Sequence, residues 1–342
     1  MLILILLLSG CIENNQNKNI NSEPKEPYYN PATIIVGKNT NSNFTTIQDA
    51  INNASDGNTI LVEPGVYQET IKVNKSVNLI GEDLNNTIIL SENSTETAEG
   101  KIFHEEKTRI NILTIVADNC LIKNFTFKTN DKNKIIRGII LDLPNNTIMN
   151  CNISGLYNAI EINQYSKNNT ICQNIISNNN VGIDATDSNG NLITDNFISN
   201  NSQQGVYFYT GSDNNVFSKN IFTNNYQALR IKMSSGNQIY ENYFYKNVYG
   251  VYFCCSARGN WVYNNTFIQN TKSSAHEDKS LWNHWNADTG PYGNYWDDYD
   301  GVDEDGDGIG DTNYIITSSE RTDFYPLMNP VDVDYYFKNK IT

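Results

Sequence analysis

The amino-acid sequence predicts an all-β protein, a right-handed, single-stranded parallel β-helix with an N-terminal capping helix. Three observations support this prediction: a repeat of 22 to 24 residues, alternation of apolar and polar residues within the repeat, and a short helical segment before it. A fixed period of this length is typical of solenoids, in which each repeat forms one turn and stacks on its neighbours.

Six asparagine-led units carry the repeat. They begin at Asn146, Asn169, Asn191, Asn215, Asn237 and Asn260. Counted from the first Asn as zero, positions two and seven are apolar in every unit, and position five is Asn in all but the first, which has Cys151. Strands of successive turns pair about 4.8 Å apart, so these apolar residues would stack into one core. Stacked asparagines would bond to one another, and asparagine also tolerates the left-handed geometry of tight corners.

A second run in each turn supplies a candidate ligand-binding face. The runs AIEI, GIDA, GVYF, ALRI and GVYF alternate in polarity as strands do, so alternate side chains should point outward. Stacking then predicts one outward stripe, which consists of Glu161, Asp184, Tyr207, Tyr209, Arg230, Lys232 and Tyr252. Tyrosine rings stack on sugar faces and charged groups bond to hydroxyls, so the stripe suits an extended polysaccharide or surface glycan.

Catalysis on the same stripe is an alternative. Glu161 and Asp184 lie on adjacent turns, as paired carboxylates for glycoside hydrolysis would. Arg230 offers a basic residue for β-elimination of uronates. An ordinary solvated face with ion pairs between turns is the third interpretation.

The start of the solenoid differs from its middle. The segment from Thr45 to Asp83 begins with a predicted short helix. Its apolar residues follow helical spacing and are Ile47, Ala50, Ile51 and Ala54. Thr45 followed by Gln48 predicts a capping box for this helix. A helix here would cover the open edge of the first turn. Residues 91–118 fit the repeat poorly, and we expect a loop after Leu90.

These segments resemble the pectin-lyase-like superfamily. Residues 33–90 resemble its N-terminal turns, and the asparagine repeats resemble its parallel β-helix repeats up to about residue 270. The resemblance implies the right-handed parallel β-helix. It also implies that, if the chain is an enzyme, it is a polysaccharide lyase or glycoside hydrolase, although the Asp clusters of polygalacturonases and the Arg signatures of pectate lyases are not evident.

The C-terminal region carries an acidic loop, GNYWDDYDGVDEDGDGIGDTNY from Gly293. Ca²⁺ takes six to eight oxygen ligands, which alternating aspartates around a glycine turn can supply. The predicted ligands are Asp303, Asp305, Asp307, the backbone carbonyl of Ile309, and Asp311. Tyr314 stands where an EF-hand would place its twelfth-position Glu, and a solvated acidic turn is the alternative.

This tail resembles those of archaeal and bacterial surface proteins with NosD-like β-helix domains. NosD is a periplasmic accessory protein of nitrous oxide reductase linked to copper, so the resemblance adds a third functional reading, an accessory factor for a metalloenzyme. Copper binding is not expected here, because the three histidines, His104, His276 and His284, are scattered and no His or Met cluster occurs.

The N-terminal residues predict export. MLILILLLSGC has an apolar run too short to cross a bilayer but suited to a signal peptide, and its end resembles a lipobox with Cys11 as the lipidated residue. The predicted organisation is a signal peptide and lipobox at 1–11, a polar tether at 12–32, the β-helix at 33–285 and a C-terminal cap at 286–342. A formal charge of −14 argues against nucleic acid as a partner. We therefore expect an exported, lipid-anchored surface protein with a structural or carbohydrate-binding role.

Overall fold

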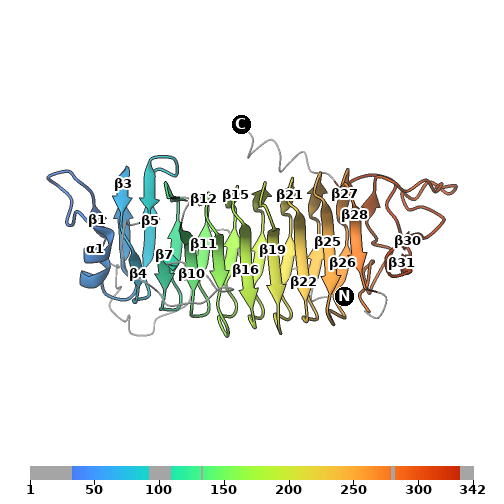
Figure 1. Cartoon of the computed structure of the whole chain (residues 1–342), viewed down its shortest axis with the longest axis horizontal. Helices are drawn as coiled ribbons and strands as arrows, with labels where there is room; N and C mark the ends of the chain where they lie inside the picture. The colour runs from blue at the N-terminus through green and yellow to red at the C-terminus, as the bar shows by residue number, and fades with distance from the viewer. Residues whose placement is uncertain (1–32, 92–108, 132–133, 279–281, 332–342) are drawn as a thin grey trace, which may run out of the picture.

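The computed structural model describes residues 33–91, 109–131, 134–278 and 282–331. It confirms the parallel β-helix: three parallel sheets run along an elongated molecule of about ten turns (Figure 1). The predictions for the signal peptide, Cys11 and the tether lie outside the described residues, as does most of the loop expected after Leu90. In the described part of the chain, no helix is long and apolar enough to cross a membrane.

Each turn contributes one strand to each sheet. Sheet 1 contains β1 (Thr33–Val36), β2 (Thr59–Val62), β5 (Asn78–Gly81), β8 (Leu121–Lys123), β11 (Thr147–Met149), β14 (Thr170–Cys172), β17 (Leu192–Thr194), β20 (Val216–Ser218), β23 (Gln238–Tyr240) and β26 (Trp261–Tyr263). Sheet 2 contains β3 (Gly65–Gln68), β6 (Thr87–Leu90), β9 (Thr126–Lys128), β12 (Asn152–Ser154), β15 (Ile175–Ser177), β18 (Phe197–Ser199), β21 (Ile221–Thr223), β24 (Tyr243–Tyr245), β27 (Thr266–Ile268) and β29 (Tyr295–Trp296). Sheet 3 contains β4 (Ile71–Val73), β7 (Arg109–Ile115), β10 (Ile135–Leu141), β13 (Asn158–Ile162), β16 (Val181–Thr186), β19 (Gln204–Tyr209), β22 (Gln227–Lys232), β25 (Tyr249–Cys254) and β28 (Ser273–Glu277).

The core consists of columns of equivalent residues. In sheet 1 one fully buried column joins successive strands through Ile60, Leu79, Ile122, Ile148, Ile171, Ile193, Phe217, Ile239 and Val262. In sheet 2 the position-seven residues stack in the same way. Towards the C-terminal end this column becomes aromatic, and the rings of Phe222, Phe244, Phe267, Trp296 and Tyr314 stack with centroids 4.4 to 4.9 Å apart.

Three ladders of asparagines, all buried except the half-buried Asn270, run beside this core. The first contains Asn169, Asn191, Asn215, Asn237, Asn260 and Asn283; the second contains Asn174, Asn196, Asn220, Asn242, Asn265 and Asn294; the third contains Asn179, Asn201, Asn225, Asn247 and Asn270. In each step the Oδ1 of one asparagine accepts from both the backbone N–H and the Nδ2 of the asparagine one turn earlier, as Asn220 does for Asn196 at 3.1 and 3.0 Å. The side chains thus satisfy polar groups that would be costly to bury alone.

Two of the ladders end on a buried carboxylate. Glu277 accepts from the backbone and side chain of Asn283 and from the indole Nε1 of Trp285 at 2.8 Å. Asp323 does the same for Asn294 and for Trp296 at 2.9 Å. A carboxylate only accepts hydrogen bonds, so it ends a ladder without needing a further acceptor.

Asparagine adopts the left-handed geometry at many of the tight corners, as predicted, but it does not occupy all of them. The residue before a ladder asparagine has positive φ, except at Asn283 and Asn294. In the first and third ladders this residue is mostly Asn or Gly, whereas the second ladder has Gln173, Asp195, Lys219, Glu241 and Asn264. Several residue types thus adopt the left-handed corner. The ladder asparagine itself is selected by its hydrogen bonds.

The predicted capping helix is present at the N-terminal end of the rod (Figure 1). Helix α1 spans Ile47–Asn53, with Ile47, Ala50 and Ile51 buried. Its N-cap is Thr46 rather than the predicted Thr45, because Thr46 is extended and its hydroxyl accepts from the Asp49 N–H at 3.2 Å. Gln48 is not part of a capping box and instead bonds to the backbone of Lys72 in β4.

The opposite end is closed by irregular chain and a short antiparallel hairpin. The hairpin contains β30 (Tyr314–Ile316) and β31 (Arg321–Asp323). It supplies Tyr314 to the aromatic stack and Asp323 to the second asparagine ladder. The C-terminal cap is therefore bonded directly into the core of the last turns.

The ladders make a testable claim about stability. In Asn220→Ala, the donors of Asn196 and the carbonyl of Ile193 lose their partner, and we expect a loss of about 3 kcal/mol in the free energy of unfolding. Urea denaturation followed by circular dichroism measures this loss. Asn52→Ala, at an exposed position of α1, is the control and should change stability by no more than about 0.5 kcal/mol. Equal effects of the two substitutions would contradict the role of the ladder.

Candidate functional site

The outer face of sheet 3 brings the predicted stripe together. Glu161, Asp184, Tyr207, Arg230 and Tyr252 are successive Cα partners on β13, β16, β19, β22 and β25. Tyr209 and Lys232 form a second column beside them, in register with Thr186 and Cys254. We call these seven predicted residues the sheet 3 stripe. All seven are partly buried, so their side chains pack on one another at the surface.

One end of the stripe is acidic. Glu161 forms a salt bridge with Arg137 of β10, with Nη1 and Oε1 2.7 Å apart. The Nδ2 of Asn158 donates to Glu161 Oε2 and to Asp184 Oδ2, at 3.1 Å in each case. Because both carboxylates accept from one nitrogen, their oxygens lie within twice that distance of each other. Glu161 is thus occupied by partners within the chain.

Asp184 differs from Glu161 in its surroundings. Burial, followed by the negative charge of Glu161, raises the pKa of Asp184 to about 7. Burial, Asp184 and Glu161 likewise raise the pKa of the Tyr209 phenol to about 12. Asp184 can therefore exchange a proton near neutral pH, whereas Tyr209 stays neutral.

The other end of the stripe is aromatic and cationic. The guanidinium of Arg230 lies over the rings of Tyr207 and Tyr252, 5.0 and 5.6 Å from their centroids. Its Nη2 also donates to the Cys254 thiol at 3.5 Å. The planar Arg230 cation is thus held between the rings of Tyr207 and Tyr252. The Tyr207 ring also stacks on Tyr209, with centroids 4.6 Å apart.

The sequence analysis missed three members of this face. Asn158 faces outward together with Glu161 because Ala159 and Ile160, between them, are both fully buried, which breaks the strict alternation on which the prediction relied. Arg137 precedes the first regular repeat and so had no counterpart to align with. His276 is the register partner of Tyr252 and stacks on it at 4.3 Å, and counting one more repeat would have found it.

Three buried polar atoms on this face have no hydrogen-bond partner. They are Asn158 Oδ1, Asp184 Oδ1 and Arg230 Nε, and the described residues contain only one other such atom, Asn58 Nδ2. Asn158 is 6% exposed, so its free oxygen is deeply set. Buried polar atoms are normally paired, so these three atoms have hydrogen-bonding capacity left for water or for a ligand.

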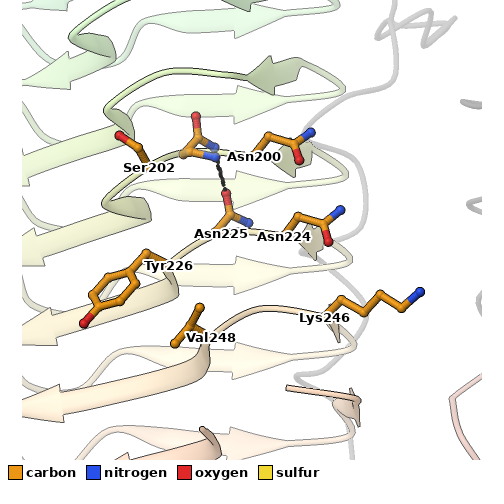
Figure 2. A pocket seen from close by; sticks show the side chains of 8 residues that line it. Asn200, Ser202, Asn224, Asn225, Tyr226, Lys246 and Val248 are labelled. Carbon is orange, nitrogen blue, oxygen red and sulfur yellow. Dashed lines mark hydrogen bonds between the residues drawn. The ribbon is translucent and has the colours of Figure 1, made fainter. Parts of the chain in front are cut away.

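A shallow hollow lies at the corner between sheets 2 and 3. It is lined by Asn200, Asn201, Ser202, Asn224, Asn225, Tyr226, Lys246 and Val248 (Figure 2). Asn201 and Asn225 belong to the third ladder, while Asn200 and Asn224 offer exposed amides. Tyr226 packs on Tyr249 at 5.8 Å, and Tyr249 packs on Tyr252 at 5.3 Å, so aromatic contacts connect the hollow to the stripe.

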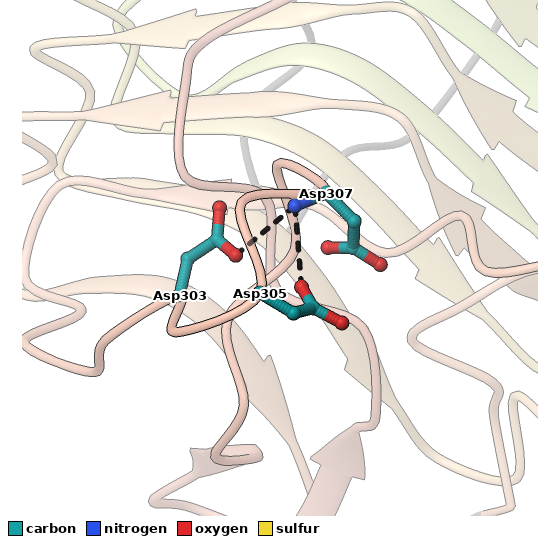
Figure 3. Close-up of side chains that lie close together, drawn as sticks. All are labelled: Asp303, Asp305 and Asp307. Carbon is teal, nitrogen blue, oxygen red and sulfur yellow. Dashed lines mark hydrogen bonds between the residues drawn. The ribbon is translucent and has the colours of Figure 1, made fainter.

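The acidic loop brings three of its predicted ligands together. One carboxylate oxygen from each of Asp303, Asp305 and Asp307 lies within 4.8 Å of the others (Figure 3). The Asp303 carboxylate accepts from the N–H groups of Gly306, Asp307 and Gly308. Asp311 is not in this group, and its carboxylate accepts from the Glu304 N–H at 2.7 Å. The Ile309 N–H donates to the Asp307 carboxylate at 2.8 Å.

The fold is an elongated parallel β-helix that carries aromatic and charged side chains in register on the outer face of one sheet. The chain belongs to the NosD family, described as periplasmic copper-binding protein, whose profile matches residues 51–227 and 129–301. This confirms both the NosD-like resemblance and the pectin-lyase-like architecture predicted from the repeats.

The chain is similar to several known proteins, of whose length it spans about half or less. A cell surface glycoprotein of Methanothermus fervidus is 31% identical over 186 residues, which are 52% of this chain and 28% of that protein. The ORF18 structure of Geobacillus virus E2 superposes with a TM-score of 0.50 at 16% identity, over 70% of this chain and 55% of the other. A PL6 family alginate lyase, AlyGC, has a TM-score of 0.47 at 13% identity, over 77% of this chain and 38% of the other.

The described residues do not fit a copper site. Copper is bound mainly by imidazole, thiolate and thioether groups. In the described ranges, the group of three His, Cys, Asp or Glu ligands that could hold a metal is the aspartate trio, whose oxygens suit hard cations. His276 stacks on Tyr252 of sheet 3, while His284 stacks on Trp261 of sheet 1.

Proposed function

We propose that this protein is an extracytoplasmic, cell-surface β-helix that binds an extended polysaccharide along the sheet 3 stripe. The observation that carries the proposal is the set of rings, amides and charged groups in register on one sheet, among which three buried polar atoms have no partner. Tyrosine rings stack on sugar faces, and the unpaired atoms offer hydrogen bonds to hydroxyls.

The electrostatics of the stripe favour binding over catalysis. Salt bridging to Arg137 occupies Glu161, and Tyr209 with its pKa of about 12 is a poor base at neutral pH. Asp184 is the one group of these three that favours catalysis, because a carboxyl with a pKa of about 7 can donate or accept a proton at neutral pH. A polysaccharide lyase or glycoside hydrolase that uses Asp184 is therefore the second candidate function.

The main proposal predicts binding without cleavage. Calorimetric titration with a panel of polysaccharides should find a ligand for the unmodified protein. Its affinity should fall at least tenfold in the double variant Tyr207→Ala/Tyr252→Ala, because the rings on both sides of Arg230 are lost. Tyr67→Phe, at a buried position of sheet 2 far from the stripe, is the control and should bind normally. New reducing ends or unsaturated products that disappear in Asp184→Asn would instead establish the enzyme.

The comparisons and the N-terminal residues support an extracytoplasmic place of action. The family is described as periplasmic and the relative as a cell surface protein, and the first eleven residues resemble a lipoprotein export signal. We propose that the chain is exported and anchored through a lipid on Cys11.

Lipid anchoring predicts a difference in detergent phase partition. Full-length protein made in a host that processes lipoproteins should enter the detergent phase, whereas Cys11→Ser should stay in the aqueous phase. Cys255→Ser, at an exposed cysteine of the folded domain, is the matched control and should partition like the unmodified chain. Aqueous partition of both the unmodified chain and Cys11→Ser would contradict the anchor.

We also propose that the acidic loop binds Ca²⁺ through Asp303, Asp305 and Asp307, with Asp311 and the Ile309 carbonyl joining them on binding. The convergence of three carboxylates supports this proposal. Calorimetry should give a Kd of about 0.1–1 mM, the range of extracellular calcium modules, and Asp305→Asn should weaken it by at least tenfold. Asp288→Asn, at an exposed position outside the loop, is the control. Equal Ca²⁺-binding heats from the unmodified chain, Asp305→Asn and Asp288→Asn would contradict the site.

A further inference from the structure

We infer that the sheet 3 stripe selects a mixed glycan, with an acidic sugar at the Arg230 end and neutral, hydroxyl- or amide-bearing sugars at the Asn158–Asp184 end. This inference rests on the proposed function and specifies its ligand. It follows from which atoms on the face lack partners, from the sign of the charge at each end, and from the distance between the ends.

The Arg230 end of the stripe favours binding of an anionic group. The guanidinium has a buried Nε without a partner, and its Nη2 donates to the neutral Cys254 thiol rather than to a carboxylate. Among the described residues, no carboxylate lies within salt-bridge distance of Arg230 or of Lys232 on the same strand. Two unpaired cations in a chain of charge −14 make this end locally positive. Guanidinium groups bind planar carboxylates with two parallel hydrogen bonds.

The Asn158–Asp184 end of the stripe favours ligand groups that donate hydrogen bonds. Its unpartnered atoms are Asn158 Oδ1 and Asp184 Oδ1, and an amide oxygen can only accept. Hydroxyl and acetamido N–H groups of neutral sugars supply such donors. A sugar carboxylate at this end would meet Glu161 and Asp184, whose mutual repulsion already contributes to the raised pKa of Asp184. Like charges at this separation are unfavourable.

The spacing of the two ends sets the order of sugars. Asp184 and Arg230 are two turns apart, which is about 10 Å at the strand spacing of a β-sheet. An extended chain of pyranose rings advances by about one strand spacing per sugar, so a trisaccharide spans from Asp184 across Tyr207 to Arg230. The acidic sugar lies at one end of this trisaccharide, and the middle sugar lies beside Tyr207. A glycan with an acid on every sugar would bind well at Arg230 but would place a carboxylate beside Glu161 and Asp184.

Three probes of equal length test the selection. They are a sialyl-N-acetyllactosamine trisaccharide with one terminal acid, a neutral tri-N-acetylchitotriose, and trigalacturonate with an acid on each sugar. We expect calorimetry at fixed salt to give the tightest binding for the first, with the other two at least tenfold weaker. The comparison uses the whole folded chain.

Variants separate the two ends. Arg230→Gln should lower the affinity for the acidic trisaccharide at least tenfold, to the neutral level, and leave the neutral probe within about twofold. Asn158→Ala should weaken both of these probes by similar factors. Lys219→Gln is the matched control, because it removes a cation from a corner away from the stripe, where glutamine already stands at the equivalent Gln173. Circular dichroism checks that each variant is folded.

The outcomes distinguish this inference from the proposed function. Equal or tighter binding of trigalacturonate, or an unchanged preference in Arg230→Gln, would overturn the mixed-glycan inference while leaving polysaccharide binding intact. Binding of no probe and of no member of the polysaccharide panel would overturn the proposed function itself.

Discussion

The hydrogen bond between asparagines of successive turns is the interaction on which the rest of this structure depends. A short strand of three residues has little stability alone, and a turn of the β-helix buries its apolar face only when another turn lies on it. The ladder bond fixes which residue lies on which, since each Oδ1 accepts from both donors of one partner. Register then places every apolar and every outward residue in a column.

The candidate site is a consequence of that register. Residues about 23 positions apart become neighbours on sheet 3, so side chains that are distant in the sequence form a row of rings and charges. The row is asymmetric, because Glu161 and Asp184 share an amide donor at one end while Arg230 lies between tyrosines at the other. A rigid scaffold holds these groups in place, which lowers the entropic cost of binding an extended ligand.

The two ends of the rod solve different physical problems. At the N-terminal end α1 covers the first strands, and Gln48 bonds it to β4. At the C-terminal end the ladders themselves must stop, and buried Glu277 and Asp323 accept the last donors with the help of tryptophan indoles. The ends thus protect both the strand edges and the asparagine columns.

The sequence by itself determined the period, the strands and the column to which each outward residue belongs, because a repeat with fixed apolar and asparagine positions can stack in one register only. It also predicted the helix and the acidic loop, with an error of one residue at the helix N-cap. Only the tertiary structure decided that Asn158 and Arg137 act on Glu161 and Asp184, and that His276 extends the stripe. The physical reason is that these contacts depend on a break in strand alternation and on side-chain reach between turns, neither of which periodicity encodes.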